Sequence, residues 1–238
     1  MPATTIGSGL NGPYSIFVTV NDEIYVDNGH NNKRVEKWTN NGTRNETAMY
    51  VEGVCYSLFV DMSDNLYCCL GLSHKVIKKP FDANANDTVI VAGNGTAGSA
   101  SHMLSNPTGI FVDIKLNLYV ADCSNNRIQT FQPGNLNGIS IVGEGAPGTI
   151  ALNCPNAVML DDDNILYVLE HHNSRVIRST SNGFRCIIGC TSSNGSASDQ
   201  MFRPWSFAFD SDGNILVADT HNDRIQKFIL TTNSCSKY

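Results

Sequence analysis

The strongest constraint on the fold is a motif that recurs five times along the chain. Each copy opens on an apolar run that begins with Pro or Cys. A second run rich in Ile, Leu, Tyr and Val follows, and then a third run with a basic residue at its start. The copies begin at residues 13, 55, 107, 155 and 204, so successive starts are 42, 52, 48 and 49 residues apart. Self-similarity at such a period indicates a repeat architecture.

The runs of each copy are short and are separated by Asp, Asn, Ser and Gly, which is typical of strands joined by tight turns. A fourth apolar run precedes the next copy, at 48–51, 88–92, 140–142 and 186–188. Four antiparallel strands in each unit of about 40–50 residues are typical of a β-propeller blade. No segment keeps a 3.6-residue period, so helices are expected to be absent or very short.

The fold class that this pattern predicts is an all-β propeller of about five four-stranded antiparallel blades. A sixth blade would require a unit that the pattern does not reveal. The predicted repeats are approximately 13–51, 55–92, 107–142, 155–188 and 204–230. The fifth copy has no strong fourth run, and Thr4-Thr5-Ile6-Gly7 resembles the missing strand. We expect residues 4–7 to pair with the fifth blade, which would remove exposed sheet edges. The chain is thus predicted to be one domain over 4–230, with 231–238 as a tail.

The runs Asn-x-Leu-Tyr-Val-Ala-Asp and Arg-Ile-Gln-x-Phe resemble the NHL repeat, most closely at 218–228. The resemblance covers about residues 4–230. It implies a propeller, often of six blades, so a count of five departs from the usual form. It also implies a choice of functions, because NHL propellers include protein-binding modules, RNA binders and one lyase group. The second copy departs from the pattern, with Cys69 near the Asp position and Lys75 at the Arg position.

Charge and composition narrow these functions. The chain has 16 Lys and Arg against 22 Asp and Glu, a net charge of −6. An acidic protein lacks the attraction that supplies most nucleic-acid affinity, so nucleic acid is not an expected partner. No apolar run approaches the ~18 residues that span a bilayer. No Ser-His-Asp, Cys-His or paired-carboxylate arrangement is determined by spacing, so no catalytic residue is predicted.

The main functional interpretation is a monomeric, non-catalytic propeller that binds a protein or a small ligand on a loop face. The first alternative is a metal-dependent lyase or hydrolase that uses the central channel, and the second is an RNA-binding NHL module. Trp205, Trp38, Tyr14 and Tyr56 are either binding anchors or core residues between blades.

Two patterns that suggest cofactors have simpler interpretations. Residues 93–98 match G-x-G-x-x-G, but no helix follows and the pattern recurs at 143–148, which favours a turn between blades. No dinucleotide cofactor is therefore predicted.

His30, His172 and His221 follow the second strand at one common offset. Equivalent loops would lie roughly 14–18 Å apart, whereas zinc needs ligand nitrogens within roughly 4 Å of each other. We expect exposed turn histidines, and we expect no matching partner for His74 or His171.

The carboxylates gather in the turns between first and second strands, which a propeller places on one face. Asp and Asn favour such turns and keep the face soluble. The alternative is an acidic rim that attracts a cation or a basic partner. Calcium is the one metal considered there, and its candidate ligands are Asp161, Asp163, Asp210 and Asp212.

Three acidic residues precede a basic residue by five positions, across the turn from the second strand to the third. We expect these to form structural ion pairs that join the two strands. The pairs are Asp122 with Arg127, Glu170 with Arg175, and Asp219 with Arg224.

The eight cysteines contain no C-x-x-C pair, which disfavours a structural zinc site. Their even number in a loop-rich chain indicates disulfides and an extracellular or secretory location. No signal peptide is visible, so the chain is also interpreted as a possible fragment. The preferred bridge is Cys123–Cys154, whose positions meet on one face of adjacent blades. Cys186 and Cys190 would be about 13 Å apart in an extended strand and can join only if the chain bends near Gly189. Five candidate N-glycosylation sites lie between the repeats, at Asn41, Asn45, Asn86, Asn94 and Asn194.

Overall fold

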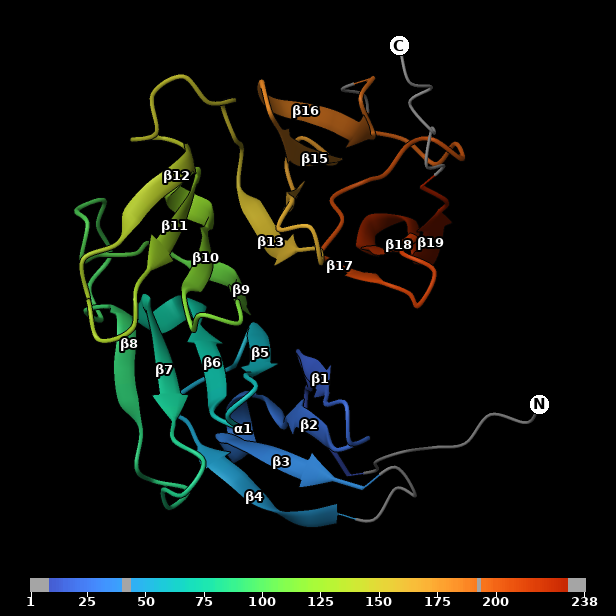
Figure 1. The fold of residues 1–238 in the computed structure, drawn as a ribbon. Helices are drawn as coiled ribbons and strands as arrows, with labels where there is room; N and C mark the ends of the chain where they lie inside the picture. Colours follow the sequence, from blue (N-terminus) through green and yellow to red (C-terminus); the bar gives the residue numbers. More distant parts are fainter. Residues whose placement is uncertain (1–8, 40–43, 192–193, 231–238) are drawn as a thin grey trace, which may run out of the picture.

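The protein is a β-propeller in which the blades follow one another in chain order around a central axis (Figure 1). The computed structural model describes residues 9–39, 44–191 and 194–230. Over these residues four sheets have four antiparallel strands and the fifth has three. The predicted all-β, five-blade architecture is confirmed. The predicted closing strand at 4–7 and the tail at 231–238 lie outside the described residues.

The strands of each blade run outward from the axis in chain order. Blade 1 contains β1 (Ile16–Val18), β2 (Ile24–Asp27), β3 (Arg34–Trp38) and β4 (Arg44–Tyr50). Blade 2 contains β5 (Ser57–Val60), β6 (Leu66–Leu70), β7 (Lys75–Lys79) and β8 (Val89–Gly93). Blade 3 contains β9 (Pro107–Val112), β10 (Leu118–Asp122), β11 (Arg127–Phe131) and β12 (Ile139–Gly143). Blade 4 contains β13 (Pro155–Leu160), β14 (Leu166–Glu170), β15 (Arg175–Thr180) and β16 (Gly183–Ile188). Blade 5 contains β17 (Ser206–Phe209), β18 (Ile215–Asp219) and β19 (Arg224–Phe228).

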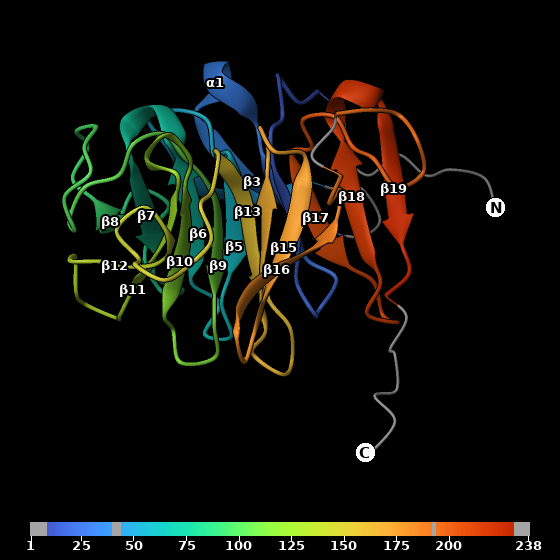
Figure 2. The ribbon, with the colours of Figure 1, turned by 90° about the horizontal axis from the view of Figure 1, so that it is seen from above.

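The helices are single turns that connect second to third strands, as expected from the missing 3.6-residue period. They are α1 (Gly29–Asn32), η1 (Gly71–Ser73), η2 (Cys123–Asn125) and η3 (Thr220–Asn222). In the side view these turns lie at one end of the propeller, and the hairpins between first and second strands lie at the other (Figure 2). We call these ends the helical-turn face and the hairpin face. Among the described residues, no helix has the length and apolar character that a membrane crossing requires.

The core lies between blades, because both faces of each inner sheet are apolar. Four clusters of buried side chains each join two neighbouring blades, from blades 1 and 2 through to blades 4 and 5. The third of these contains Ile128 from β11, Val142 from β12 and Val158 from β13, all at most 2% exposed. Burial of a side chain of this size stabilises the fold by about 1.5–3 kcal/mol. A fifth cluster contains Ile24, Val26, Trp38 and Leu10, all from blade 1 and the segment before it.

Three disulfides are present. Cys123 in η2 is joined to Cys154, at the entry to blade 4, with 4.0 Å between their Cα atoms. Cys186 is joined to Cys190, and their Cα atoms lie 5.6 Å apart because Gly189 (φ +68°) bends the chain. The third bridge, Cys55–Cys68, was not assigned from the sequence. Cys69 is a free, buried thiol, and Cys235 lies outside the described residues.

Candidate functional site

Five equivalent residues surround the channel at the helical-turn face. Each is the second residue of its repeat, and we call them the mouth ring: Tyr14, Tyr56, Thr108, Asn156 and Trp205. All five line a cavity of about 490 Å³ that occupies the channel. The first strands place them there, because each first strand begins at this face and runs along the axis. The same cavity extends outward to Ile225 in β19.

Blades 5, 1 and 2 supply an aromatic arc of the mouth ring. The ring centroids of Tyr14 and Tyr56 are 5.1 Å apart, and the indole of Trp205 lies 6.1 Å from each of them, edge-on. Edge-to-face aromatic pairs at this separation are favourable by about 0.5–1.5 kcal/mol beyond their buried area. Tyr14 is nevertheless 52% exposed. The arc is therefore packed together and still accessible from solvent. Trp38, in contrast, is buried in blade 1, so it is a core residue and not an anchor.

Blades 3 and 4 supply a polar arc. Thr108 donates its hydroxyl to the Pro155 carbonyl at 3.1 Å. Asn156 is 3% exposed, and its Nδ2 has no hydrogen-bond partner among the described residues. Its Oδ1 lies 3.5 Å from the sulfur of Cys154, but that sulfur belongs to a disulfide and carries no hydrogen. An unsatisfied buried amide costs about 1–3 kcal/mol, so Asn156 is the polar group in this ring that most needs a partner.

A histidine extends the aromatic arc toward blade 4. The His171 imidazole lies 5.9 Å from the Trp205 indole and 6.3 Å from the His221 imidazole, centroid to centroid. Its Nδ1 lies 3.1 Å from the Pro204 carbonyl, which accepts the Nδ1–H. Burial is the main cause that lowers the pKa of His171, and the neighbouring His172, Arg203 and His221 lower it further. His171 is therefore a neutral imidazole at neutral pH, with its Nδ1 already occupied.

His74 and His171 make contacts that the sequence did not indicate. His171 points inward to the first strand of blade 5, whereas the distance argument from sequence treated only the turn positions. His74 accepts a hydrogen bond from the Asn106 N–H at 3.0 Å. His30, His172 and His221 are exposed. Within residues 9–39, 44–191 and 194–230, no group of three or more His, Cys, Asp or Glu is arranged to hold a metal ion.

The carboxylates of the hairpin face are engaged in their own turns. Asp161 accepts the backbone N–H groups of Asp163 at 3.0 Å and Ile165 at 2.8 Å. Asp210 accepts the N–H of Asp212 at 2.9 Å, and Lys227 lies 2.7 Å from its other oxygen. These contacts favour the turn interpretation of the acidic residues. A calcium site formed by the candidates Asp161, Asp163, Asp210 and Asp212 stays a prediction.

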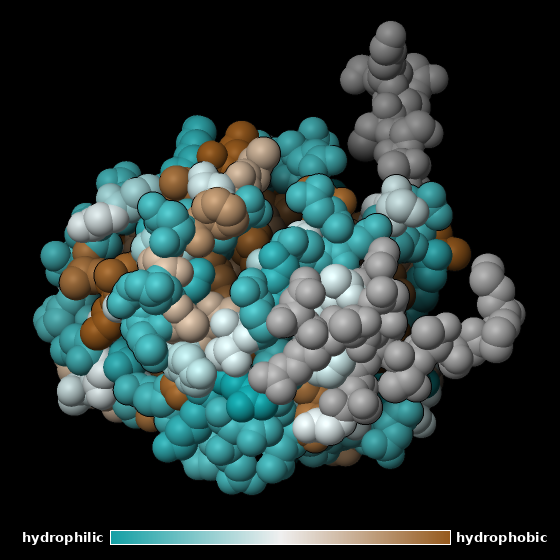
Figure 3. Space-filling model, turned by 90° about the horizontal axis from the view of Figure 1, so that it is seen from below, coloured by the Kyte–Doolittle hydropathy of each residue, from teal (hydrophilic) through white to brown (hydrophobic). Residues whose placement is uncertain are grey.

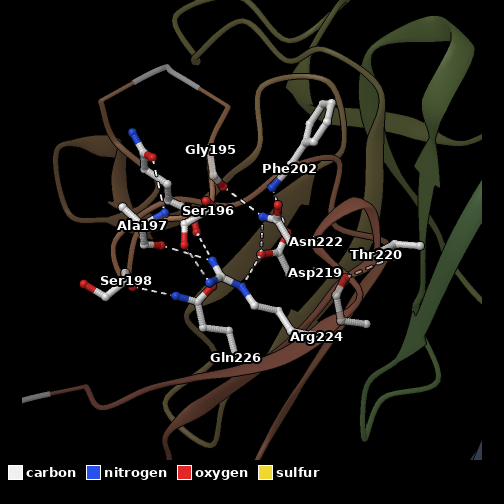
Figure 4. Close-up of polar contacts among 12 residues, drawn as sticks. Gly195, Ser196, Ala197, Ser198, Phe202, Asp219, Thr220, Asn222, Arg224 and Gln226 are labelled. Carbon is white, nitrogen blue, oxygen red and sulfur yellow. Dashed lines mark hydrogen bonds and ion pairs between the residues drawn. The ribbon is translucent and has the colours of Figure 1, made fainter.

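The ion pairs between second and third strands have a further contact that the sequence did not indicate. In blade 5, the Arg224 Nε lies 2.8 Å from Asp219. The remaining guanidinium nitrogens donate to the carbonyls of Ser196, Ala197 and Gln200, at 2.8–3.0 Å (Figure 4). These carbonyls belong to the segment that crosses into the blade from blade 4. We call this arrangement the crossing clamp.

Blades 3 and 4 contain the clamp as well. Arg127 lies 2.8 Å from Asp122 and donates to three carbonyls between residues 99 and 103. Arg175 pairs with Glu170 and donates to the Ala151 carbonyl. The acidic partner also accepts a backbone N–H of the crossing segment, at Ser105 in blade 3, Asn153 in blade 4 and Phe202 in blade 5. The clamp is therefore structural, and it fixes each first strand at the channel.

Blades 1 and 2 depart from the clamp. In blade 2, Leu70 stands opposite Lys75 in the position of the acid, and Lys75 pairs with Glu52 at 2.9 Å instead. In blade 1, Asn28 takes the acid's place and accepts the Asn11 N–H at 2.8 Å. The departure in blade 2 was visible in the sequence as Cys69 and Lys75.

A model of a known repeat family matches the chain at two of the five repeats. The NHL repeat family model matches residues 104–131 and 203–228, which include the ion pairs of the clamps in blades 3 and 5. This chain is a β-propeller with NHL repeats at these two positions. No curated protein sequence matches it.

Several solved structures share the fold of this propeller. A streptogramin B lyase structure is 14% identical, with a TM-score of 0.65; the match covers 92% of this chain and 66% of that one. An auxiliary nutrient binding protein from Bacteroides thetaiotaomicron VPI-5482 is 15% identical, with a TM-score of 0.69, and the match covers 95% and 61%. The extracellular domain of a putative hybrid two-component system from B. thetaiotaomicron is 11% identical, with a TM-score of 0.60, and the match covers 91% and 30%. This chain thus spans two thirds or less of each of these proteins.

Proposed function

We propose that this NHL propeller is a non-catalytic binding scaffold whose ligand enters the channel through the mouth ring. The observation that carries the proposal is the pairing of an accessible aromatic arc with a buried amide that lacks partners, at the entrance to a cavity of about 490 Å³. Cavities of this size with mostly apolar walls and a few polar groups are typical of small-ligand sites.

The chemistry of the mouth ring favours a ligand that carries an amide next to an apolar or aromatic group. The aromatic arc of Tyr14, Tyr56 and Trp205 offers ring faces and edges. Asn156 offers amide N–H donors and a carbonyl acceptor, and a ligand amide can pair with one donor and the acceptor together. Such a ligand is a small acylated amine or a side chain and backbone amide of a protein partner.

The test uses Trp205 as a fluorescent reporter. The chain has two tryptophans, so a Trp38→Phe variant leaves Trp205 alone. N-acetylphenylalaninamide serves as the probe. A saturable change in Trp205 fluorescence is expected, and Tyr14→Ala should weaken the apparent affinity by about tenfold, the equivalent of about 1.4 kcal/mol. Tyr50→Ala is the matched control, because Tyr50 has nearly the same exposure, 49%, but lies on the outer strand of blade 1.

Two results would contradict the scaffold proposal. One is a fluorescence response that rises linearly with probe concentration and never saturates. The other is an equal loss of affinity in Tyr14→Ala and Tyr50→Ala, which would place the probe away from the channel.

A lyase is the second candidate function, favoured by the fold shared with streptogramin B lyase and by His171 and His221 beside the channel mouth. Incubation with a streptogramin B antibiotic, followed by chromatography, tests it. Loss of the antibiotic that is abolished by His171→Ala would favour the enzyme. An unchanged antibiotic over many hours would dismiss this activity.

We further propose that the chain works outside the cytosol. The three disulfides are consistent with an extracellular location, and Asn86, Asn94 and Asn194 are exposed. Asn41 lies outside the described residues, and the side chain of Asn45 is not described. Thiol titration of the denatured protein should show six additional thiols after reduction. An equal count before and after reduction would refute this location.

A further inference from the structure

A second cavity lies between blades 2 and 3, close to the hairpin face. It has a volume of about 320 Å³, and none of the residues that line it lines the channel. One wall is formed by β7 and β8 of blade 2, and the other by the hairpin loops of blade 3 that contain Leu116 and Leu136. Apolar side chains reach the surface among hydrophilic ones at the left of Figure 3, on the side where Figure 1 places β8.

Lys78 is the one cation among the described residues that line this cavity. It lies in β7, in a cross-strand row with Tyr67 and Val89. In blades 1 and 5 the lysine at the same repeat position forms an ion pair with an acid of the turn before the second strand. These pairs are Lys37 with Glu23, at 2.6 Å, and Lys227 with Asp210, at 2.7 Å. In the described part of the chain, no carboxylate oxygen lies within 4.0 Å of the Lys78 Nζ.

The acid that blade 2 has in this turn, Asp61, is occupied by other donors. Asp61 is 5% exposed. Its Oδ2 accepts the Tyr67 hydroxyl at 2.9 Å and the Asn65 side-chain amide at 2.8 Å. The Lys78 Nζ lies instead over the Tyr67 ring, 6.0 Å from its centroid, at the outer limit of a cation–π contact. The positive charge is therefore available to an anion that enters the cavity.

The opposite wall contains a leucine in a backbone conformation that disfavours it. Leu116 has a φ of +63°, and a left-handed backbone brings the Cβ of an L-residue close to the next carbonyl oxygen. The other blades place Asp, Asn or Gly at this turn position: Asp22, Asp64, Asn164 and Gly213. Backbone strain of this kind gathers at binding sites. Leu116 lines the cavity, so what the leucine adds to the turn is an apolar wall.

We propose that this cavity binds a small monocarboxylate with an apolar tail. The carboxylate pairs with Lys78, and the tail lies between β8 and Leu116. Val89 and Leu136 line the same space and are 49% and 45% exposed, so the tail would remove apolar surface from water. An ion pair next to apolar walls is stronger than one in open water.

The charge of the rest of the protein makes this preference local. The chain has a net charge of −6, so it does not attract anions in general. The described residues that line the channel include no Lys or Arg. A carboxylate is therefore expected at Lys78 and not in the channel.

The test measures the binding of octanoate by isothermal titration calorimetry, with octan-1-ol as the neutral analogue. One octanoate should bind per chain in a saturable manner. Lys78→Gln should weaken octanoate binding by about tenfold and leave octan-1-ol unaffected, and Lys78→Arg should retain the binding. Lys227→Gln is the matched control, because it removes the same charge at the same repeat position of blade 5. It should change the affinity by less than about twofold.

Two more variants separate the wall from the charge and this cavity from the channel. Leu116→Asn should weaken octanoate binding by about tenfold, because each methylene that returns to water costs about fourfold in affinity. Asn occupies this turn position in blade 4, so the variant should still unfold cooperatively in urea. Tyr14→Ala, in the mouth ring, should leave octanoate binding unchanged.

Three results would overturn the proposal. The first is a heat that rises linearly with octanoate and never saturates. The second is an equal loss of affinity in Lys78→Gln and Lys227→Gln, because net charge and not the cavity would then attract the anion. The third is octanoate binding that Tyr14→Ala abolishes and Lys78→Gln leaves intact, because the ligand would then lie in the channel.

Discussion

Asp27 provides a sharp test of how burial controls the electrostatics of this fold. It ends β2, is 0% exposed, and lies beneath the crossing from blade 1 to blade 2. Its two oxygens accept the N–H groups of Cys55 and Gly29, each at 3.3 Å. Burial outweighs these hydrogen bonds and raises the pKa of Asp27 from 3.8 to about 6. The charged carboxylate is therefore less stable in the folded protein than in the unfolded chain.

The sign of the pH dependence follows from that difference. Below about pH 4 the folded and unfolded states both hold the proton. Between about pH 4 and pH 6 the folded state keeps a proton that the unfolded state has released, so the free energy of unfolding falls as pH rises. The rise in pKa from 3.8 to about 6 is equivalent to about 3 kcal/mol at 1.36 kcal/mol per pH unit. This amount of stability is present at acidic pH and is lost above pH 6.

Asp27→Asn removes the titration while it keeps the shape of the side chain. Urea unfolding of both proteins from pH 4 to pH 7 gives the difference in free energy of unfolding, in which the other titrating groups cancel. As pH rises over this range, the free energy of unfolding of the variant should increase by about 3 kcal/mol relative to that of the parent. Asp162→Asn, in an exposed hairpin turn, is the matched control and should keep a constant difference. A flat difference for Asp27→Asn, or one of opposite sign, would refute the burial argument.

Three further predictions concern the clamps and the cysteines. Arg127→Ala should lower the free energy of unfolding by about 3–5 kcal/mol in urea titrations, because it leaves the fully buried Asp122 without its cation; a loss below about 1 kcal/mol would contradict this. Cys123→Ser should lower it by about 3 kcal/mol, because the bridge to Cys154 closes a long loop, and reduction of the parent, which breaks all three bridges, should lower it further. Burial raises the pKa of the Cys69 thiol, so iodoacetamide should not label it before unfolding, and labelling of the native protein at pH 8 would count against its burial.

The repeat architecture could be predicted because period and alternation are written directly in the side chains. Val120 and Ile128 are apolar and occupy positions where the sheet packs against the neighbouring blades, and both are fully buried. The clamp carbonyls could not be predicted, because every residue has a carbonyl and the crossing segments differ in length. The sequence located Arg127 and Asp122 but not the backbone that Arg127 binds.

The Cys55–Cys68 bridge could not be assigned from the sequence, because it depends on how the strands of blade 2 pair. Cys68 and Cys69 are neighbours in β6, so their side chains point to opposite faces of the sheet. Cys68 lies with Cys55 in the cluster between blades 1 and 2, and Cys69 lies in the cluster between blades 2 and 3. Without the pairing of β5 and β6, the sequence offered both cysteines equally. The contact of His171 with Trp205 was missed for a similar reason, since side-chain direction decides it.

The crossing clamp has a consequence for how such chains change in length. Arg224 and the carbonyls that it binds lie within 28 residues of each other, and Arg127 shows the same span. A gene segment that encodes one such stretch therefore carries both the cation and its docking backbone. Duplication of that segment would insert a blade whose arginine already binds the segment that leads into it. Excision of the segment would remove a blade and leave no unpaired charged residue in the neighbouring blades. The number of blades can thus change by whole blades during evolution, while each remaining blade keeps its own crossing clamp.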